Sequence, residues 1–188
     1  RMLPESMINS MSLTTFNTFI AENKVVDATD TRSQQVINVG TNLKNATITY
    51  LKKHGYGKRV KQFSWAFKLV EDPTINAFCL PGGKIVVYSG ILPVTLTDAG
   101  LATVMSHEIA HAVARHGNER MSQQLALTMG GVALSVAIQN NPQETQNVFN
   151  SVYGIGGILG ILAYSRKHEY EADKIGMVFM AMAGYDPQ

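Results

Sequence analysis

The motif His-Glu-x-x-His at residues 107–111 constrains this chain more than any other feature of its sequence. Residues four apart lie on the same face of an α-helix, so His107 and His111 can direct two imidazoles at one ion. Glu108 lies about 100° further round the helix, where its carboxylate can reach a water on that ion without binding the ion itself. The pattern is typical of two metal ligands with a general base beside them.

Two histidines and a glutamate on a helix can also be surface decoration, and the motif occurs by chance. The neighbouring residues argue against this reading, because apolar side chains occupy much of the circumference of the helix. They are Val104, Met105, Ile109, Ala110, Ala112, Val113 and Ala114. Such a helix is buried, and histidines buried beside a carboxylate need polar partners. The pattern therefore favours a metal site.

A catalytic zinc needs a third protein ligand and an open coordination position. His116 is a candidate, but it lies nine residues after His107. The extended metzincin motif requires glycine at position 114 and histidine at position 117, where this chain has Ala114 and Gly117. We therefore interpret His116 as a histidine at the end of a helix, where it interacts favourably with the helix dipole.

The segment SRKHEYEADKIG, further along the chain, offers carboxylates for the third position. Glu169 and Asp173 are four residues apart and share a face with Ala172 and Gly176, small residues that permit close helix packing. One carboxylate can bind the ion while the other accepts a hydrogen bond from the second nitrogen of a ligating histidine. Glu171 is expected to point elsewhere. The alternative, two exposed acids paired with basic neighbours, is weaker beside the histidine motif.

Length and composition describe one globular domain. The chain has 188 residues, of which 45% are hydrophobic and 16% charged, and this suits a packed core rather than a disordered segment. The formal net charge of +2 is too small to imply a nucleic-acid partner. Cys79 is the only cysteine, which excludes an intrachain disulfide.

The first half of the chain predicts two helices and a small sheet. Helical periodicity covers residues 5–23 and 28–53. Two or three short strands are expected between Gln62 and Tyr88. Two of them should pair antiparallel across the turn Pro81-Gly82-Gly83.

The second half predicts helices. The first runs from Thr97 or Asp98 through His116, with Gly117 available to end it. Two apolar runs follow, at 125–138 and 152–163, and both are shorter than the roughly 18 to 20 residues of a membrane span. We expect them to form a tightly packed helical hairpin. The expected single domain, 1–188, comprises N-terminal helices (1–60), a small sheet (61–92) and catalytic helices (97–188), truncated at the C-terminus.

Three ordered motifs carry a family resemblance. SHEIAHAVARHGNER, preceded by NAFCLPGGKIVVYSGIL and followed by SRKHEYEAD, resembles the zinc metalloendopeptidase family that includes the CAAX prenyl proteases, HtpX, the mitochondrial Oma peptidases, BepA and LoiP. The match runs from about Trp65 to the end of the chain. The resemblance implies a mostly helical α+β fold of the zincin-like (gluzincin) type, with the small sheet beside the helix of the histidine motif.

The same resemblance assigns roles to the motif residues. His107, His111 and Glu169 become the ligands of one Zn²⁺ ion, Glu108 becomes the catalytic base, and Asp173 contacts a ligating histidine. Family members continue past the end of this chain into a segment that can supply a further active-site residue. A donor to the transition state is therefore expected to be missing here.

The implied function is zinc-dependent hydrolysis of peptide bonds in protein substrates, as part of envelope protein quality control. Unfolded or misassembled envelope proteins are the expected substrates. The family branch implies the bacterial periplasm, either as an outer-membrane lipoprotein whose signal has been removed or through peripheral membrane association. A short strand at Asn76 to Phe78 or Lys84 to Tyr88 offers an edge for substrate pairing. Asn76, with Ala77, is the preferred contact, although a turn-forming asparagine explains Asn76 equally well.

Two other functions fit the same sequence. A chaperone-like module could keep this fold and hold client proteins with the apolar segment 121–164, with little proteolysis. A purely structural helical protein could carry the histidine motif by chance. Metal content separates the last of these from the other two.

Overall fold

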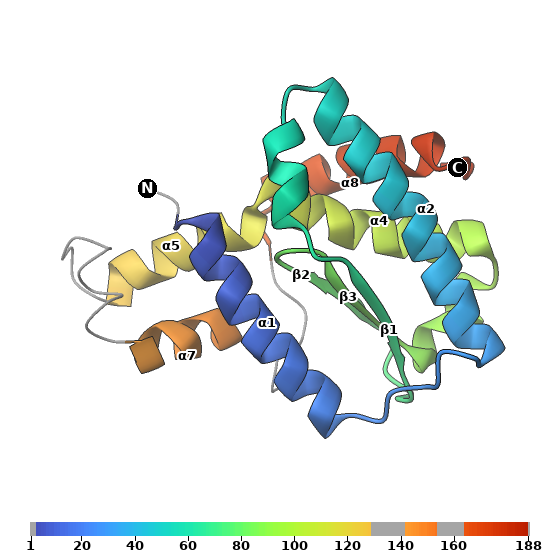
Figure 1. Ribbon diagram of the computed structural model, residues 1–188, viewed down its shortest axis with the longest axis horizontal. Coiled ribbons are helices and arrows are strands. Elements are labelled where there is room, and N and C mark those ends of the chain that lie inside the picture. The colour runs from blue at the N-terminus through green and yellow to red at the C-terminus, as the bar shows by residue number, and fades with distance from the viewer. Residues whose placement is uncertain (1–2, 129–141, 154–163, 188) are drawn as a thin grey trace.

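Helices surround one three-stranded sheet in the computed structural model, which describes residues 3–128, 142–153 and 164–187 (Figure 1). The mostly helical α+β fold predicted from the sequence is confirmed. The apolar hairpin expected at 125–138 and 152–163 lies largely outside these residues. Within the described parts of the chain, no helix combines the length and the apolar character that a bilayer span requires.

Two long helices open the chain, close to the predicted ranges. Helix α1 spans Glu5–Glu22 and helix α2 spans Thr31–Lys53. The Asp30 side chain accepts a hydrogen bond from the backbone N–H of Arg32, and this cap sets the start of α2. A 3₁₀ helix, η1, follows at Gly57–Gln62.

The sheet contains β1 (Ala66–Val70), β2 (Ala77–Leu80) and β3 (Lys84–Tyr88), in the order β1-β3-β2. Strands β2 and β3 pair antiparallel across Pro81–Gly83, as predicted. Strand β1 pairs parallel with β3. Because β3 lies between the other two, β2 forms one edge of the sheet. After β3, the chain continues into η2 (Ser89–Ile91) and α3 (Leu92–Thr95).

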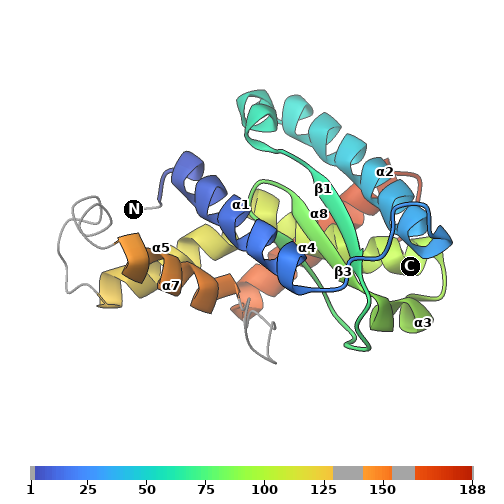
Figure 2. The same ribbon diagram turned by 60° about the horizontal axis from the view of Figure 1, so that its bottom comes forward.

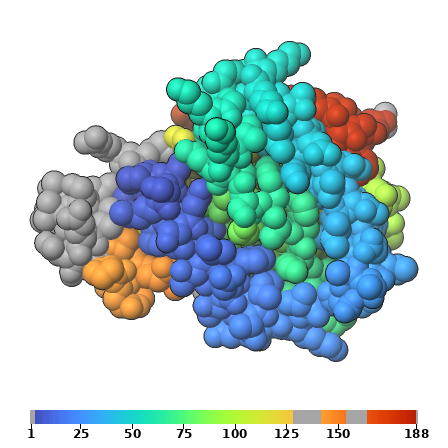
Figure 3. Space-filling view, viewed as in Figure 1, coloured from blue at the N-terminus to red at the C-terminus, as the bar shows by residue number. Residues whose placement is uncertain are grey.

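Successive side chains of each strand point to opposite faces of the sheet, and each face packs into its own apolar cluster. One face packs against α2, α4 (Asp98–Ala114) and α8 (Arg166–Met182); its residues are Leu69, Ala77, Cys79, Ile85 and Val87. The other face meets α1, α5 (His116–Thr128) and α7 (Pro142–Tyr153) through Val70, Phe78, Leu80 and Val86. Figure 1 accordingly shows the sheet between α1 and α2, with α5 and α7 together beyond α1 (Figures 1 and 2). In the space-filling view, α1 and α2 flank the β1 segment (Figure 3).

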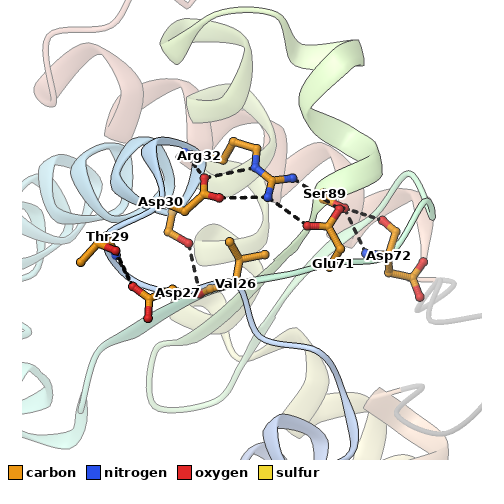
Figure 4. Close-up of polar contacts among 9 residues, drawn as sticks. Val26, Asp27, Thr29, Asp30, Arg32, Glu71, Asp72 and Ser89 are labelled. Carbon is orange, nitrogen blue, oxygen red and sulfur yellow. Dashed lines mark hydrogen bonds and ion pairs between the residues drawn. The ribbon is translucent and has the colours of Figure 1, made fainter.

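A polar network joins the start of α2 to the ends of two strands (Figure 4). The Arg32 guanidinium lies 3.0 Å from both Asp30 Oδ2 and Glu71 Oε2. The Ser89 hydroxyl donates to the carbonyl of Asp72 at 3.0 Å. The ion pairs of Arg32 are exposed and contribute little stability individually, and the pair with Glu71 joins α2 to the end of β1.

Helix α4, which carries the histidine motif, begins and ends with defined caps. The Thr97 hydroxyl accepts from the N–H of Gly100 at 3.1 Å. The helix ends at Ala114, because Arg115 takes the left-handed conformation (φ 64°), and α5 starts at the next residue. The predicted continuation through His116 and stop at Gly117 is therefore wrong.

The dipole interpretation of His116 is wrong for the same reason. His116 begins α5 rather than ending α4, so the positive end of a helix dipole lies beside it. Sequence periodicity did not reveal the break, because arginine rarely adopts a left-handed conformation. Its side chain is held there by an ion pair with Glu5 of α1.

Helix α8 packs directly on α4 through a glycine. A Cβ atom at Gly176 would lie 3.2 Å from the backbone nitrogen of His107 and 3.3 Å from its Cα. Ala172, one turn earlier, is fully buried in the same contact. The small residues predicted for close helix packing therefore bring the backbone of α8 to the histidine motif.

We expect Gly176→Ala to lower the free energy of unfolding by about 1–3 kcal/mol, because the added methyl presses on backbone atoms of α4 that cannot rotate away. Alanine is the better helix former by about 1 kcal/mol, so any loss must come from the contact. Urea denaturation measures the change. Gly57→Ala is the control, since a Cβ there would meet nothing closer than 3.9 Å. Equal stability of the two variants would contradict the close contact.

Candidate metal centre

Three ligand-type side chains converge where α4 meets α8. Each of His107, His111 and Glu169 offers one ligand atom, and these atoms all lie within 4.8 Å of one another. The two imidazole Nε2 atoms are 3.0 Å apart. The Glu169 oxygens lie 3.2 Å from His107 Nε2 and 3.6 Å from His111 Nε2. Ligand atoms about 2.0–2.1 Å from a tetrahedral zinc lie roughly 3.3 Å from each other, so this arrangement has the right size for the ion.

Local structure brings the three side chains together. His107 and His111 are one turn apart on α4, and the Gly176 contact brings α8 against that turn. Ser165 starts α8 by accepting from the N–H of His168 at 3.2 Å, which places Glu169 in the first turn. The centre therefore depends on one helix–helix contact and one helix start.

The His107 ring is oriented by Asp173. The Nδ1 atom of His107 lies 2.9 Å from Asp173 Oδ1. A carboxylate only accepts hydrogen bonds, so this contact places the proton on Nδ1 and leaves the Nε2 lone pair directed at the centre. This is the contact that the sequence spacing predicted for one of the two downstream acids.

The His111 ring is buried and held on two sides. The Tyr164 ring stacks on it with centroids 4.0 Å apart and planes 15° apart. Its Nδ1 atom lies 2.9 Å from Nδ1 of His116. Burial, followed by the nearby imidazoles, lowers the pKa of His111 to about 3 and keeps the ring neutral, the form that binds metal.

Sequence reasoning missed three neighbours of the centre. Tyr164 lies just before the cap of α8, and no local pattern marked it. His116 is no ligand in the predicted set, yet it is buried against His111, where burial lowers its pKa. Glu171 does point away from the ligand atoms, as expected, but it faces His116 at 3.3 Å.

Glu108 lies beside the centre in a cavity of about 690 Å³. His107 and Asp173 line the same cavity, and apolar side chains make up much of the remaining wall. Burial, followed by the nearby Glu169 carboxylate, raises the pKa of Glu108 to about 8. Its carboxylate can therefore accept a proton far more readily than an exposed glutamate can.

Asn76 directly precedes Ala77, the first residue of β2, which is the edge strand against which α4 packs. The carbonyl of Asn76 accepts from the N–H of Tyr88 in the adjacent strand at 3.1 Å. Antiparallel strands alternate their hydrogen-bonding direction, so the backbone groups of Ala77 and Cys79 face away from β3. The Asn76 side chain already accepts from the N–H of Ala77 at 2.9 Å.

Comparison with known proteins identifies related sequences. The model of peptidase family M48 matches residues 42–188. The chain is 38% identical over 137 residues to the mitochondrial metalloendopeptidase OMA1 of Arabidopsis thaliana, covering 73% of this chain and 26% of that protein. It is 38% identical over 128 residues to OMA1 of Schizosaccharomyces pombe, covering 68% and 36%. It is also 32% identical over 129 residues to the beta-barrel assembly-enhancing protease of Escherichia coli, covering 65% and 26%. The chain thus corresponds to about a quarter to a third of each relative.

We expect Asp173→Asn to weaken zinc affinity by roughly 10–100-fold, because an amide is a poorer acceptor for the His107 Nδ1–H than a carboxylate. Competition with a chromophoric chelator measures the change. Asp186→Asn, at an exposed acid near the end of the chain, is the control and should bind zinc as the wild type does. Unchanged affinity in Asp173→Asn would contradict the orienting role of this carboxylate.

Proposed function

The chain belongs to peptidase family M48, and from this membership we propose that it is a zinc-dependent endopeptidase acting on protein substrates. The observation that carries the proposal is the convergence of His107, His111 and Glu169, with Glu108 beside them. The two OMA1 relatives are named metalloendopeptidases, which agrees with this chemistry.

Zinc is the metal that the donor set fits best. Two neutral imidazoles and one carboxylate form a three-ligand site of the kind found in catalytic zinc centres, with a fourth position left for water or substrate. When bound, zinc would supply a strong electrophile for a peptide carbonyl and acidify water. His107 holds its proton on Nδ1, against Asp173, so its Nε2 presents a lone pair.

Glu108 is proposed as the proton carrier. Its carboxylate lies in the cavity that also exposes His107, within reach of a water between the ligands and the substrate. There it would accept a proton from the attacking water and deliver it to the nitrogen of the leaving amine. Burial, followed by the nearby Glu169 carboxylate, raises the pKa of Glu108, and a raised pKa makes the ionised carboxylate a stronger proton acceptor.

Substrate is proposed to pair as an extended strand with the edge of β2 that faces away from β3. Backbone groups of Ala77 and Cys79 face this edge, and α4 packs against the same strand. Pairing at Ala77 requires the Asn76 side chain to release the N–H that it now holds. Asn76 would then be free to donate its own amide hydrogens to the substrate backbone.

The cavity beside Glu108 is proposed to accept an apolar side chain of the substrate. Its wall is mostly apolar and includes Val104, Met177 and Met180, close to the proposed base. An apolar side chain gains free energy by leaving water for such a surface. Cleavage should therefore favour peptide bonds next to an apolar residue.

The cellular role is proposed as protein quality control in the bacterial envelope, with unfolded or misassembled proteins as substrates. The similarity to a beta-barrel assembly-enhancing protease supports this assignment. The similarity to mitochondrial relatives supports the alternative that the protein acts in a mitochondrion. Fractionation of cells that express the natural gene with an epitope tag distinguishes the two, and periplasmic recovery is the expected result.

We expect Glu108→Gln to abolish casein hydrolysis while leaving one zinc per chain, because the change removes the base and spares the ligands. Mass spectrometry of the purified protein measures its zinc content, and the release of fluorescein-labelled peptides from labelled casein measures activity. Glu22→Gln, at an exposed acid on α1, is the control. Loss of zinc in Glu108→Gln would show a structural role for this residue, and full activity would favour another base.

We expect Met177→Lys to lower kcat/KM for peptides with an apolar residue at the cleaved bond by roughly 10-fold, because a charge in the cavity opposes apolar binding. Val178→Lys is the matched control, since this neighbour on α8 is similarly exposed (41% against 48%) and lies outside the cavity lining. Equal losses in both variants would argue against the cavity as a substrate subsite.

A further inference from the structure

We propose that His116 and Glu171 are positioning residues that select the metal-binding tautomer of His111. The inference rests on the proposed zinc centre and adds a second support to it. Glu171 acts on His116, and His116 acts on His111. The three side chains form a hydrogen-bonded chain from α8 through the start of α5 to α4.

The contact between the two histidines has only one donor. His111 Nδ1 and His116 Nδ1 are 2.9 Å apart, and both side chains are almost fully buried. A neutral imidazole carries its proton on one nitrogen and accepts at the other. One of the two Nδ1 atoms must therefore donate while the other accepts.

Glu171 determines which of the two histidines donates in this hydrogen bond. Its Oε2 lies 3.3 Å from His116 Nε2, and a carboxylate can only accept. His116 therefore holds its proton on Nε2 and presents an unprotonated Nδ1. His111 must then carry its proton on Nδ1, which leaves its Nε2 lone pair directed at His107 and Glu169.

The opposite tautomer would disable the centre. A proton on His111 Nε2 would point at the place where the three ligand atoms converge, 3.0 Å from His107 Nε2. Metal binding would then have to displace that proton, move the shared proton from His116 Nδ1 to His111 Nδ1, and place a proton on His116 Nε2. The carboxylate of Glu171 removes this cost by fixing the proton positions in advance.

The His116 ring is held so that it can perform this role. Its backbone follows the left-handed Arg115, which α1 secures through Glu5. The His168 ring stacks on it with centroids 4.3 Å apart and planes 18° apart. His168 is itself 3.3 Å from Glu119. A flip of the His116 ring would break its contacts with both His111 and Glu171.

The two ligating histidines thus receive different supports. His107 donates directly to Asp173, whose side chain is 63% exposed. His111 donates to the buried neutral ring of His116. The carboxylate of Glu171, nearer the surface, contacts the other side of that ring. The buried support avoids placing a charged carboxylate beside His111 in the interior, where its desolvation would be expensive.

Two measurements on the full 188-residue chain test the inference. Chelator competition with zinc gives affinity, and ¹⁵N-histidine NMR of the zinc form gives the tautomer of each ring. We expect His111 to be protonated at Nδ1 and His116 at Nε2. His116→Phe should weaken zinc affinity by roughly 10–100-fold. His116→Asn, whose side-chain oxygen can accept in place of Nδ1, should restore most of it.

Glu171 provides a second variant at a half-exposed position that is expected to fold. We expect Glu171→Ala to weaken zinc affinity by roughly 10-fold. Glu22→Ala is the control, because it removes an exposed carboxylate at the end of α1. It should leave affinity unchanged.

The inference is overturned if Glu171→Ala binds zinc as tightly as the wild type does, or if His116 is protonated at Nδ1 in the zinc form. If His116→Phe fails to fold, the zinc affinity of Glu171→Ala and the tautomer of His116 still test the inference. A wild-type chain that takes up no zinc would overturn the proposed function together with this inference. Normal zinc uptake with a wild-type-like Glu171→Ala would overturn the inference alone.

Discussion

The site depends on one backbone contact between α4 and α8. Gly176 lets α8 approach until only 3.2 Å would separate a Cβ from the His107 nitrogen. Because the contact joins two backbones, no flexible side chain can absorb an error in the distance between the helices. Asp173 and Glu169 lie three and seven residues before Gly176, on the same stripe of α8. One contact therefore sets the positions of both acids relative to the two imidazoles.

A second constraint acts at the other end of α4. Arg115 and Arg59 both pair with Glu5, which joins α1, η1 and the turn between α4 and α5. Such partly buried ion pairs are weak evidence for stability, since desolvation offsets much of the attraction. Their geometry is specific, however, and it holds the left-handed turn that starts α5 at His116. The N-terminal helix, remote in sequence, thus supports the residue that contacts His111.

Helical periodicity predicted which side chains of one helix lie on the same face. Four-residue spacing was sufficient for His107 with His111 and for Glu169 with Asp173. The β2–β3 turn was also predictable, because its glycines mark it locally. The parallel pairing of β1 and the contact between His116 and Glu171 were not, since each joins segments whose relative placement only the packed fold defines. The helix end at Arg115 was missed because a tertiary ion pair overrides the local preference.

Burial prepares two residues of the site in opposite ways. It lowers the pKa of His111 to about 3, which keeps a ligand neutral. It also raises the pKa of Glu108 to about 8, which keeps a base protonated at neutral pH. A nearby dication stabilises an ionised carboxylate and disfavours an imidazolium. Metal binding would therefore leave His111 neutral and would favour the ionised, basic form of Glu108.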